Sequence, residues 1–199
     1  MRAILFGSIG TLAETSDMQR TAFNDAFKAH GLGWHWDVKT YAALLKHAGG
    51  QERIARFAHS RGETVDDAAI HTLKSELFQQ SLSARAALRP GVADTVALAK
   101  ARGLNVALAT TTSAANVDAL LDATGLSRAR FDIVLDASQG LPPKPAPDVF
   151  HAALLAMDMA PQDALAIEDN PDGFRAARAA GLACLAFPGR LHENADFAG

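Results

Sequence analysis

Four short polar clusters follow apolar runs in this sequence. They lie at residues 7–12, 110–113, 144–148 and 168–170. Hydroxyl groups at the start of a helix bind phosphate, a lysine adds positive charge, and paired carboxylates supply the oxygen ligands that a divalent cation requires. Together these residue types predict a site for a phosphorylated small molecule and a metal ion.

The apolar runs before these clusters must position them. Such runs, bounded by Gly, Pro, Asp or Thr, lie at residues 3–6, 106–109, 133–135, 164–167 and 183–187. Runs without polar alternation are typical of strands buried on both faces of a parallel sheet. Because segments with helical spacing separate the later runs, the pattern predicts an α/β fold with a doubly wound, Rossmann-like parallel sheet. Ligands of such sheets bind beyond the carboxyl ends of the strands, where all four clusters lie.

Residues 14–88 interrupt this alternation. They contain apolar pairs at helical spacing, such as Phe23 with Phe27 and Ile70 with Leu73, and no strand-like run. We therefore expect a small all-helical cap at residues 14–88, inserted into a Rossmann-like core made of residues 1–13 and 89–199.

Composition limits the class of protein. Of 199 residues, 49% are hydrophobic and 21% are charged, which suffices to bury a core. A formal net charge of -3 without a basic cluster excludes a typical nucleic-acid binder, and no apolar run approaches the ~18 residues that span a bilayer. The single cysteine, Cys184, is compatible with a reducing cytoplasm and is expected to be a small core residue. We expect a cytoplasmic monomer.

Four blocks of the sequence resemble the haloacid dehalogenase superfamily. They are AILFGSIGTLAET, NVALATTTSAANVDALL, PPKPAPDVF and LAIEDNPDGFRAARAAGL, and the cap segment from AFNDAF through GGQERIARF is also similar. The resemblance covers essentially the full length and is strongest to the CbbY-type branch, whose members are sugar-phosphate phosphatases with a helical cap.

The resemblance implies a role for each cluster. In the family, an Asp that ends the first strand attacks the phosphoryl group to form an aspartyl-phosphate, and a second Asp two residues later acts as general acid and base. The remaining groups hold the phosphate and Mg²⁺. Carried over by position, the phosphate holders are Thr110, Thr111 and Lys144, and the Mg²⁺ holders are Glu168, Asp169 and the backbone carbonyl of Ile9.

The two attacking residues of the family are absent. Where the family has Asp-x-Asp-Gly-Thr, this chain has Gly7-Ser8-Ile9-Gly10-Thr11, so Gly7 stands at the nucleophile position and Ile9 at the acid/base position. Loss of the nucleophile in a protease lowers turnover about 10⁶-fold. We therefore expect hydrolysis to be lost or very weak, with phosphate binding and a weakened Mg²⁺ site partly kept.

Three cap residues are expected to contact the substrate. Gln19 stands where the branch commonly has a His, and Gln51 stands where a Lys or Arg usually reaches for substrate. Arg53 is also placed to reach from the cap, although a salt bridge along its helix fits its position equally well. The seven histidines show no metal-ligand spacing and are expected at the surface or in the cap. The implied ligand is a small phosphorylated metabolite, a sugar phosphate.

The sequence leaves three functions open. The chain is an enzyme that hydrolyses a phosphorylated sugar, a non-catalytic phosphosugar-binding or regulatory protein, or a decayed duplicate without a ligand. An active phosphatase would need a substitute nucleophile. Ser8 is the nearest hydroxyl, but because side chains alternate along a strand we expect it to point away from the site that positions 7 and 9 face.

Overall fold

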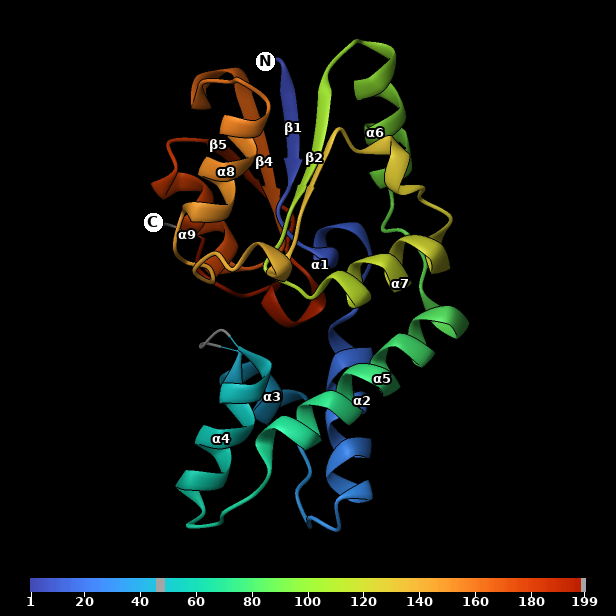
Figure 1. Ribbon diagram of the computed structural model, residues 1–199, viewed down its shortest axis with the longest axis vertical. Coiled ribbons are helices and arrows are strands. Elements are labelled where there is room, and N and C mark those ends of the chain that lie inside the picture. The colour runs from blue at the N-terminus through green and yellow to red at the C-terminus, as the bar shows by residue number, and fades with distance from the viewer. Residues whose placement is uncertain (46–48, 198–199) are drawn as a thin grey trace.

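A five-stranded parallel sheet forms the centre of the molecule. The computed structural model describes residues 1–45 and 49–197 (Figure 1). In spatial order the strands are β3 (Ile133–Leu135), β2 (Asn105–Ala109), β1 (Ala3–Phe6), β4 (Ala164–Glu168) and β5 (Ala183–Ala186). All neighbours pair in parallel. The predicted doubly wound α/β fold is confirmed.

Helices cover both faces of the sheet. Alternate residues of β1 separate the two cores, since Ile4 and Phe6 pack with α1, α6 and α7, whereas Ala3 and Leu5 pack with α8 and α9. The core helices are α1 (Ile9–Leu12), α6 (Val92–Ala101), α7 (Ala114–Thr124), α8 (Asp148–Ala156) and α9 (Pro171–Ala179), with 3₁₀ turns at Arg128–Arg130, Ala137–Gln139, Pro161–Asp163 and Arg190–His192.

The outer strands differ from the prediction of burial on both faces. All three residues of β3 are half-buried, and in β5 Leu185 is 53% exposed. Because β5 lies at the edge of the sheet, the side chains on one of its faces lack a covering helix. Cys184 is accordingly half-buried and not a full core residue.

Four helices form the inserted segment below the sheet in Figure 1. They are α2 (Ser16–Ala29), α3 (Val38–Leu44), α4 (Gly50–Ser60) and α5 (Asp67–Arg85). Their core is aromatic, with Trp36 fully buried and its ring centroid 4.7 Å from that of Phe27. An antiparallel bridge between Ala13 and Leu88 joins the points at which the chain enters and leaves this segment.

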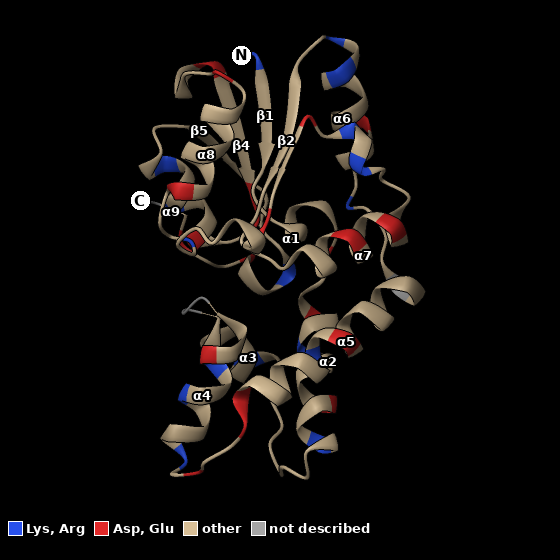
Figure 2. Ribbon diagram, in the orientation of Figure 1, with Lys and Arg blue, Asp and Glu red and all other residues tan. Residues whose placement is uncertain are grey.

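Helix α5 joins the cap to the core. It runs from the cap to α7 (Figure 1), and its residues Phe78 and Leu82, both fully buried, belong to the same hydrophobic cluster as Phe6 and Val117. The Gln79 side-chain amide donates a hydrogen bond of 2.9 Å to the side-chain oxygen of Asn116 on α7. Lys and Arg are scattered over both parts of the molecule (Figure 2), and no helix among the described residues is long and apolar enough to cross a membrane.

Candidate functional site

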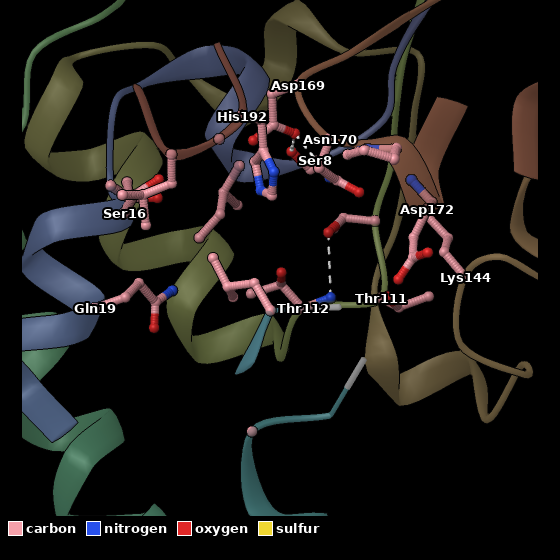
Figure 3. Close-up of a pocket in the computed structure, with 18 of the residues that line it drawn as sticks. Ser8, Ser16, Gln19, Thr111, Thr112, Lys144, Asp169, Asn170, Asp172 and His192 are labelled. Carbon is pink, nitrogen blue, oxygen red and sulfur yellow. Dashed lines mark hydrogen bonds between the residues drawn. The ribbon is translucent and has the colours of Figure 1, made fainter. Parts of the chain in front are cut away.

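A cavity of about 1000 Å³ lies between the cap and the carboxyl edge of the sheet. Its core wall comes from the loops after β1, β2, β3 and β4 and from the segment 190–196, and its cap wall comes from α2, α3, α4 and α5. Figure 3 shows side chains from these separate segments pointing toward one another. Residues from all four polar clusters of the sequence line this cavity, beyond the carboxyl ends of the strands.

The loop after β2 presents hydroxyl groups at the start of α7. Thr110 is buried, and its Oγ1 accepts a hydrogen bond of 3.1 Å from the backbone N–H of Thr112. Thr111, Thr112 and Ser113 line the cavity, and Figure 3 labels the two threonines. Ser113 is the N-cap of α7, but its side chain makes no capping hydrogen bond. The first turn of α7 can therefore donate N–H hydrogen bonds to an anion.

Lys144 lies at the meeting point of three strands. Its ammonium donates to the carbonyl oxygen of Gly7 after β1, to that of Ala109 at the end of β2 (2.8 Å), and to Oε1 of Glu168 at the end of β4 (2.6 Å). An ammonium has three N–H donors, so these contacts use all of them. Lys144 lines the cavity, but in this arrangement it supplies charge and no hydrogen bond to a ligand.

Glu168 is turned out of the cavity. Its side chain is fully buried behind Gly7, and a Cβ built on Gly7 or on Gly173 would overlap the carboxylate. Burial raises the pKa of Glu168 to about 7, and the neighbouring charge of Asp169 adds to this effect while Lys144 opposes it. Thus the carboxylate fills the space that a side chain at position 7 would need.

Ser8 points toward the acidic pair, contrary to expectation. Its Oγ donates a hydrogen bond of 2.5 Å to Oδ1 of Asp169 (Figure 3) and also accepts one from the backbone N–H of Thr11. Strand alternation does not reach this residue because β1 ends at Phe6 and Ser8 is already the N-cap of α1.

The residues expected to hold Mg²⁺ do not form an ion site. Asp169 lines the cavity and Glu168 does not, while the carbonyl of Ile9 accepts a helical hydrogen bond of 3.0 Å from Ala13. Ile9 itself is the first residue of α1, and its side chain packs in the core. Over residues 1–45 and 49–197, no group of three or more His, Cys, Asp or Glu side chains could hold a metal ion. The donors therefore do not fit the oxygen set that Mg²⁺ requires.

The cap contributes cations to the cavity. Lys74 on α5 is 4% exposed, donates to the side-chain oxygen of Gln19, and lies 4.7 Å from the centroid of the Phe23 ring. Burial, together with the charge of Arg53, lowers the pKa of Lys74 to about 7. Arg53 is buried, and its Nε donates 3.1 Å to the carbonyl of Leu44. Burial likewise lowers the pKa of Arg53.

Gln51 does not join these residues. It is exposed in the first turn of α4 and lies outside the cavity lining, whereas Gln19 and Arg53 are part of it. Helix α4 begins at Gly50, and the helical rotation between positions 51 and 53 turns the glutamine toward solvent.

The cavity-lining residues that sequence reasoning missed include Lys74, His71 and His192. A signal for Lys74 exists, since it follows Ile70 by four residues and precedes Phe78 by four, which places a charge on an apolar helix face. His192 lies beside Asp169 (Figure 3) and is half-buried, not a surface residue. It belongs to a 3₁₀ turn near the C-terminus that carries no recognisable pattern.

The fold agrees with the comparisons with known proteins. The haloacid dehalogenase-like hydrolase family model matches residues 1–181. The chain belongs to this family. It is 44% identical over 205 residues to protein CbbY of Cereibacter sphaeroides, covering all of this chain and 89% of that protein. It is 42% identical to the plasmid protein CbbY of Cupriavidus necator, covering all of this chain and 83% of that protein.

Solved structures of family members give the same result. The structure of CbbY from Rhodobacter sphaeroides in complex with phosphate has a TM-score of 0.92 and 42% identity, covering all of this chain and 91% of that one. A mutant of that protein, solved in complex with xylulose-(1,5)bisphosphate, has the same TM-score, identity and coverage. The expected resemblance to CbbY-type members of the family is confirmed.

Proposed function

We propose that this chain binds a phosphorylated sugar in the cavity and does not hydrolyse it through an aspartyl-phosphate. The relative from Rhodobacter sphaeroides binds phosphate and, as a mutant, xylulose-(1,5)bisphosphate. Here the phosphate would lie at the start of α7, against the hydroxyls of Thr111, Thr112 and Ser113 and near the charge of Lys144. The sugar would face Gln19 and Arg53 on the cap wall.

The proposed loss of hydrolysis rests on Gly7 and on the position of Glu168 beside it. Gly7 offers no attacking group, and the Glu168 carboxylate already fills the volume that a side chain there would occupy. Glu168 cannot replace the attacker from this position because it lies outside the cavity lining and is bonded to Lys144. The cavity thus keeps groups that attract an anion, while position 7 lacks a side chain that could attack it.

A second candidate function rests on the contact between Ser8 and Asp169. A hydroxyl bonded to a carboxylate at 2.5 Å is an arrangement that activates a nucleophile, and both residues line the cavity. The same hydroxyl, however, caps α1 in a reciprocal capping box with Thr11. This structural use accounts for its position without catalysis.

The test measures hydrolysis and binding separately. Phosphate release is followed from a panel of sugar mono- and bisphosphates with Mg²⁺, for the wild type, Ser8→Ala and Lys144→Ala. We expect no release from any of them. Release that disappears in Ser8→Ala would instead establish the second candidate function.

Binding is measured as the shift in melting temperature with xylulose-(1,5)bisphosphate. At a ligand concentration about a hundredfold above Kd, stabilisation of about 2.7 kcal/mol should raise Tm by about 5 to 10 °C. Thr111→Val should reduce this shift, whereas the matched change Thr124→Val, at the opposite end of α7, should not. No shift in the wild type would contradict the proposed function.

A further inference from the structure

We propose that this chain holds its ligand without a divalent metal ion. The buried pair of Lys144 with Glu168 keeps out of the cavity a carboxylate that would otherwise hold the ion. The inference rests on the proposed function for the identity of the ligand. Its evidence is the direction of each oxygen donor at the carboxyl edge of the sheet.

Glu168 cannot reach an ion in the cavity. One oxygen, Oε1, is 2.6 Å from the Lys144 ammonium. The other, Oε2, is buried without a hydrogen-bond partner and lies against Gly173 in the first turn of α9, where a Cβ would already overlap it. Between that oxygen and the helix there is no room for an ion with its own ligand shell. The positive end of α9 favours a carboxylate at this point without any metal.

The other expected donors are also engaged. Oδ1 of Asp169 accepts hydrogen bonds from Ser8 (2.5 Å) and from the Asn170 amide (3.0 Å). Its Oδ2 lies against Gly10, where a Cβ would overlap it. The carbonyl of Ile9 points along α1 toward Ala13. Of the two carboxylates expected to hold the ion, only Asp169 lines the cavity, and it is already hydrogen-bonded, whereas Mg²⁺ requires a near-octahedral set of oxygens.

Lys144 takes the place of the ion as the fixed positive charge. Its three hydrogen bonds tie together the ends of β1, β2 and β4, so the ammonium is held rigidly beside the cavity. The ring of Phe150 lies 4.5 Å from Nζ and shields it on another side. A divalent cation placed close to this ammonium would also be repelled by it.

The experiment titrates the metal alone. Mn²⁺ is added to the wild type and free Mn²⁺ is followed by its electron paramagnetic resonance signal. We expect no saturable site. Saturable binding that disappears in Asp169→Asn would overturn the inference. Because the readout needs no phosphate, the result decides the inference even if the proposed function fails.

A second measurement uses inorganic phosphate as the probe. Its Kd, measured by calorimetry in Mg²⁺ and in EDTA, should agree within about twofold, which is less than 0.5 kcal/mol. A tenfold tighter Kd in Mg²⁺ would contradict the proposal. Absence of phosphate binding in both solutions would contradict the proposed function instead, and the Mn²⁺ titration would still stand.

A variant at position 7 tests whether the position of the Glu168 carboxylate prevents metal binding. Gly7→Asp places a carboxylate at the cavity wall and must displace Glu168 from its present position. It should create a saturable Mn²⁺ site, whereas the matched Gly7→Asn, of equal size and without charge, should not. Equal Mn²⁺ binding by the wild type and Gly7→Asp would refute the argument, and circular dichroism verifies that both variants are folded.

Discussion

Replacing Lys144 with methionine tests whether Lys144 and Glu168 form an energetic unit. The substitution keeps the length of the side chain and removes the ammonium. Two carbonyl groups, of Gly7 and Ala109, lose a donor, at about 1 kcal/mol each and independently of pH. The effect on Glu168, by contrast, depends on pH.

The direction in which stability changes with pH follows from the protonation of Glu168. Its pKa is raised from 4.5 to about 7 in the folded protein, so stability falls as pH rises from 4.5 to about 7 and is then constant. In Lys144→Met the buried carboxyl has lost its counter-ion and keeps its proton to higher pH. Each further pH unit then costs the variant about 1.4 kcal/mol relative to the wild type. Between about pH 7 and about pH 9 the extra cost is about 2.7 kcal/mol.

Urea unfolding of both proteins near pH 6 and near pH 9 measures this difference. The double variant Lys144→Met with Glu168→Gln is the control, because it has no carboxyl at position 168 to titrate. Its unfolding free energy should lack the extra fall that Lys144→Met shows above about pH 7, where the Glu168 contribution to the wild type is also constant. A cost of Lys144→Met that is equal at both pH values would refute the reasoning. So would a double variant that is as pH-dependent as the single one.

Three further predictions concern other contacts. Lys74→Met should stabilise the fold most below about pH 7, where the desolvated ammonium is charged, and its advantage in thermal unfolding should shrink as pH rises toward 10.5, because the wild-type lysine is then neutral in the folded state. Arg89→Ala removes donors to the carbonyls of Phe187 (2.8 Å) and Pro188 (2.7 Å) and should cost about 1.5–3 kcal/mol in urea unfolding, with faster hydrogen exchange in residues 187–197. Gly173→Ala should lower Tm although alanine favours helices by about 1 kcal/mol, because its Cβ overlaps Glu168; the same change made in a Glu168→Ala background should no longer lower Tm relative to Glu168→Ala alone.

The fold could be predicted because its central strands are uniformly apolar. In β1 and β2 nearly every residue is buried, so the sequence shows an unbroken apolar run. The same reading failed for β5, where Leu185 is half exposed. A short apolar run does not reveal whether its strand lies in the middle or at the edge of a sheet, since that depends on which elements pack beside it.

The location of the site could also be predicted, but not the use of its groups. Thr110, Lys144 and Asp169 all lie at strand ends, and the cavity forms there. The direction of Glu168 depends on two glycines, Gly7 and Gly173, that belong to different elements and together leave room for its carboxylate. No local pattern contains this information, because it is a property of the packed sheet and helix.

Helix α5 determines how the protein unfolds, because it packs in both parts of the molecule. Its N-terminal half packs in the aromatic cap through Ile70, and its C-terminal half packs in the main core through Phe78 and Leu82. Melting the cap alone would therefore strip apolar cover from the sheet, and melting the sheet alone would leave half of α5 without support. We expect the cap and the sheet to unfold in one calorimetric transition, so that a shift in Tm reports on the whole chain and not on one of its parts.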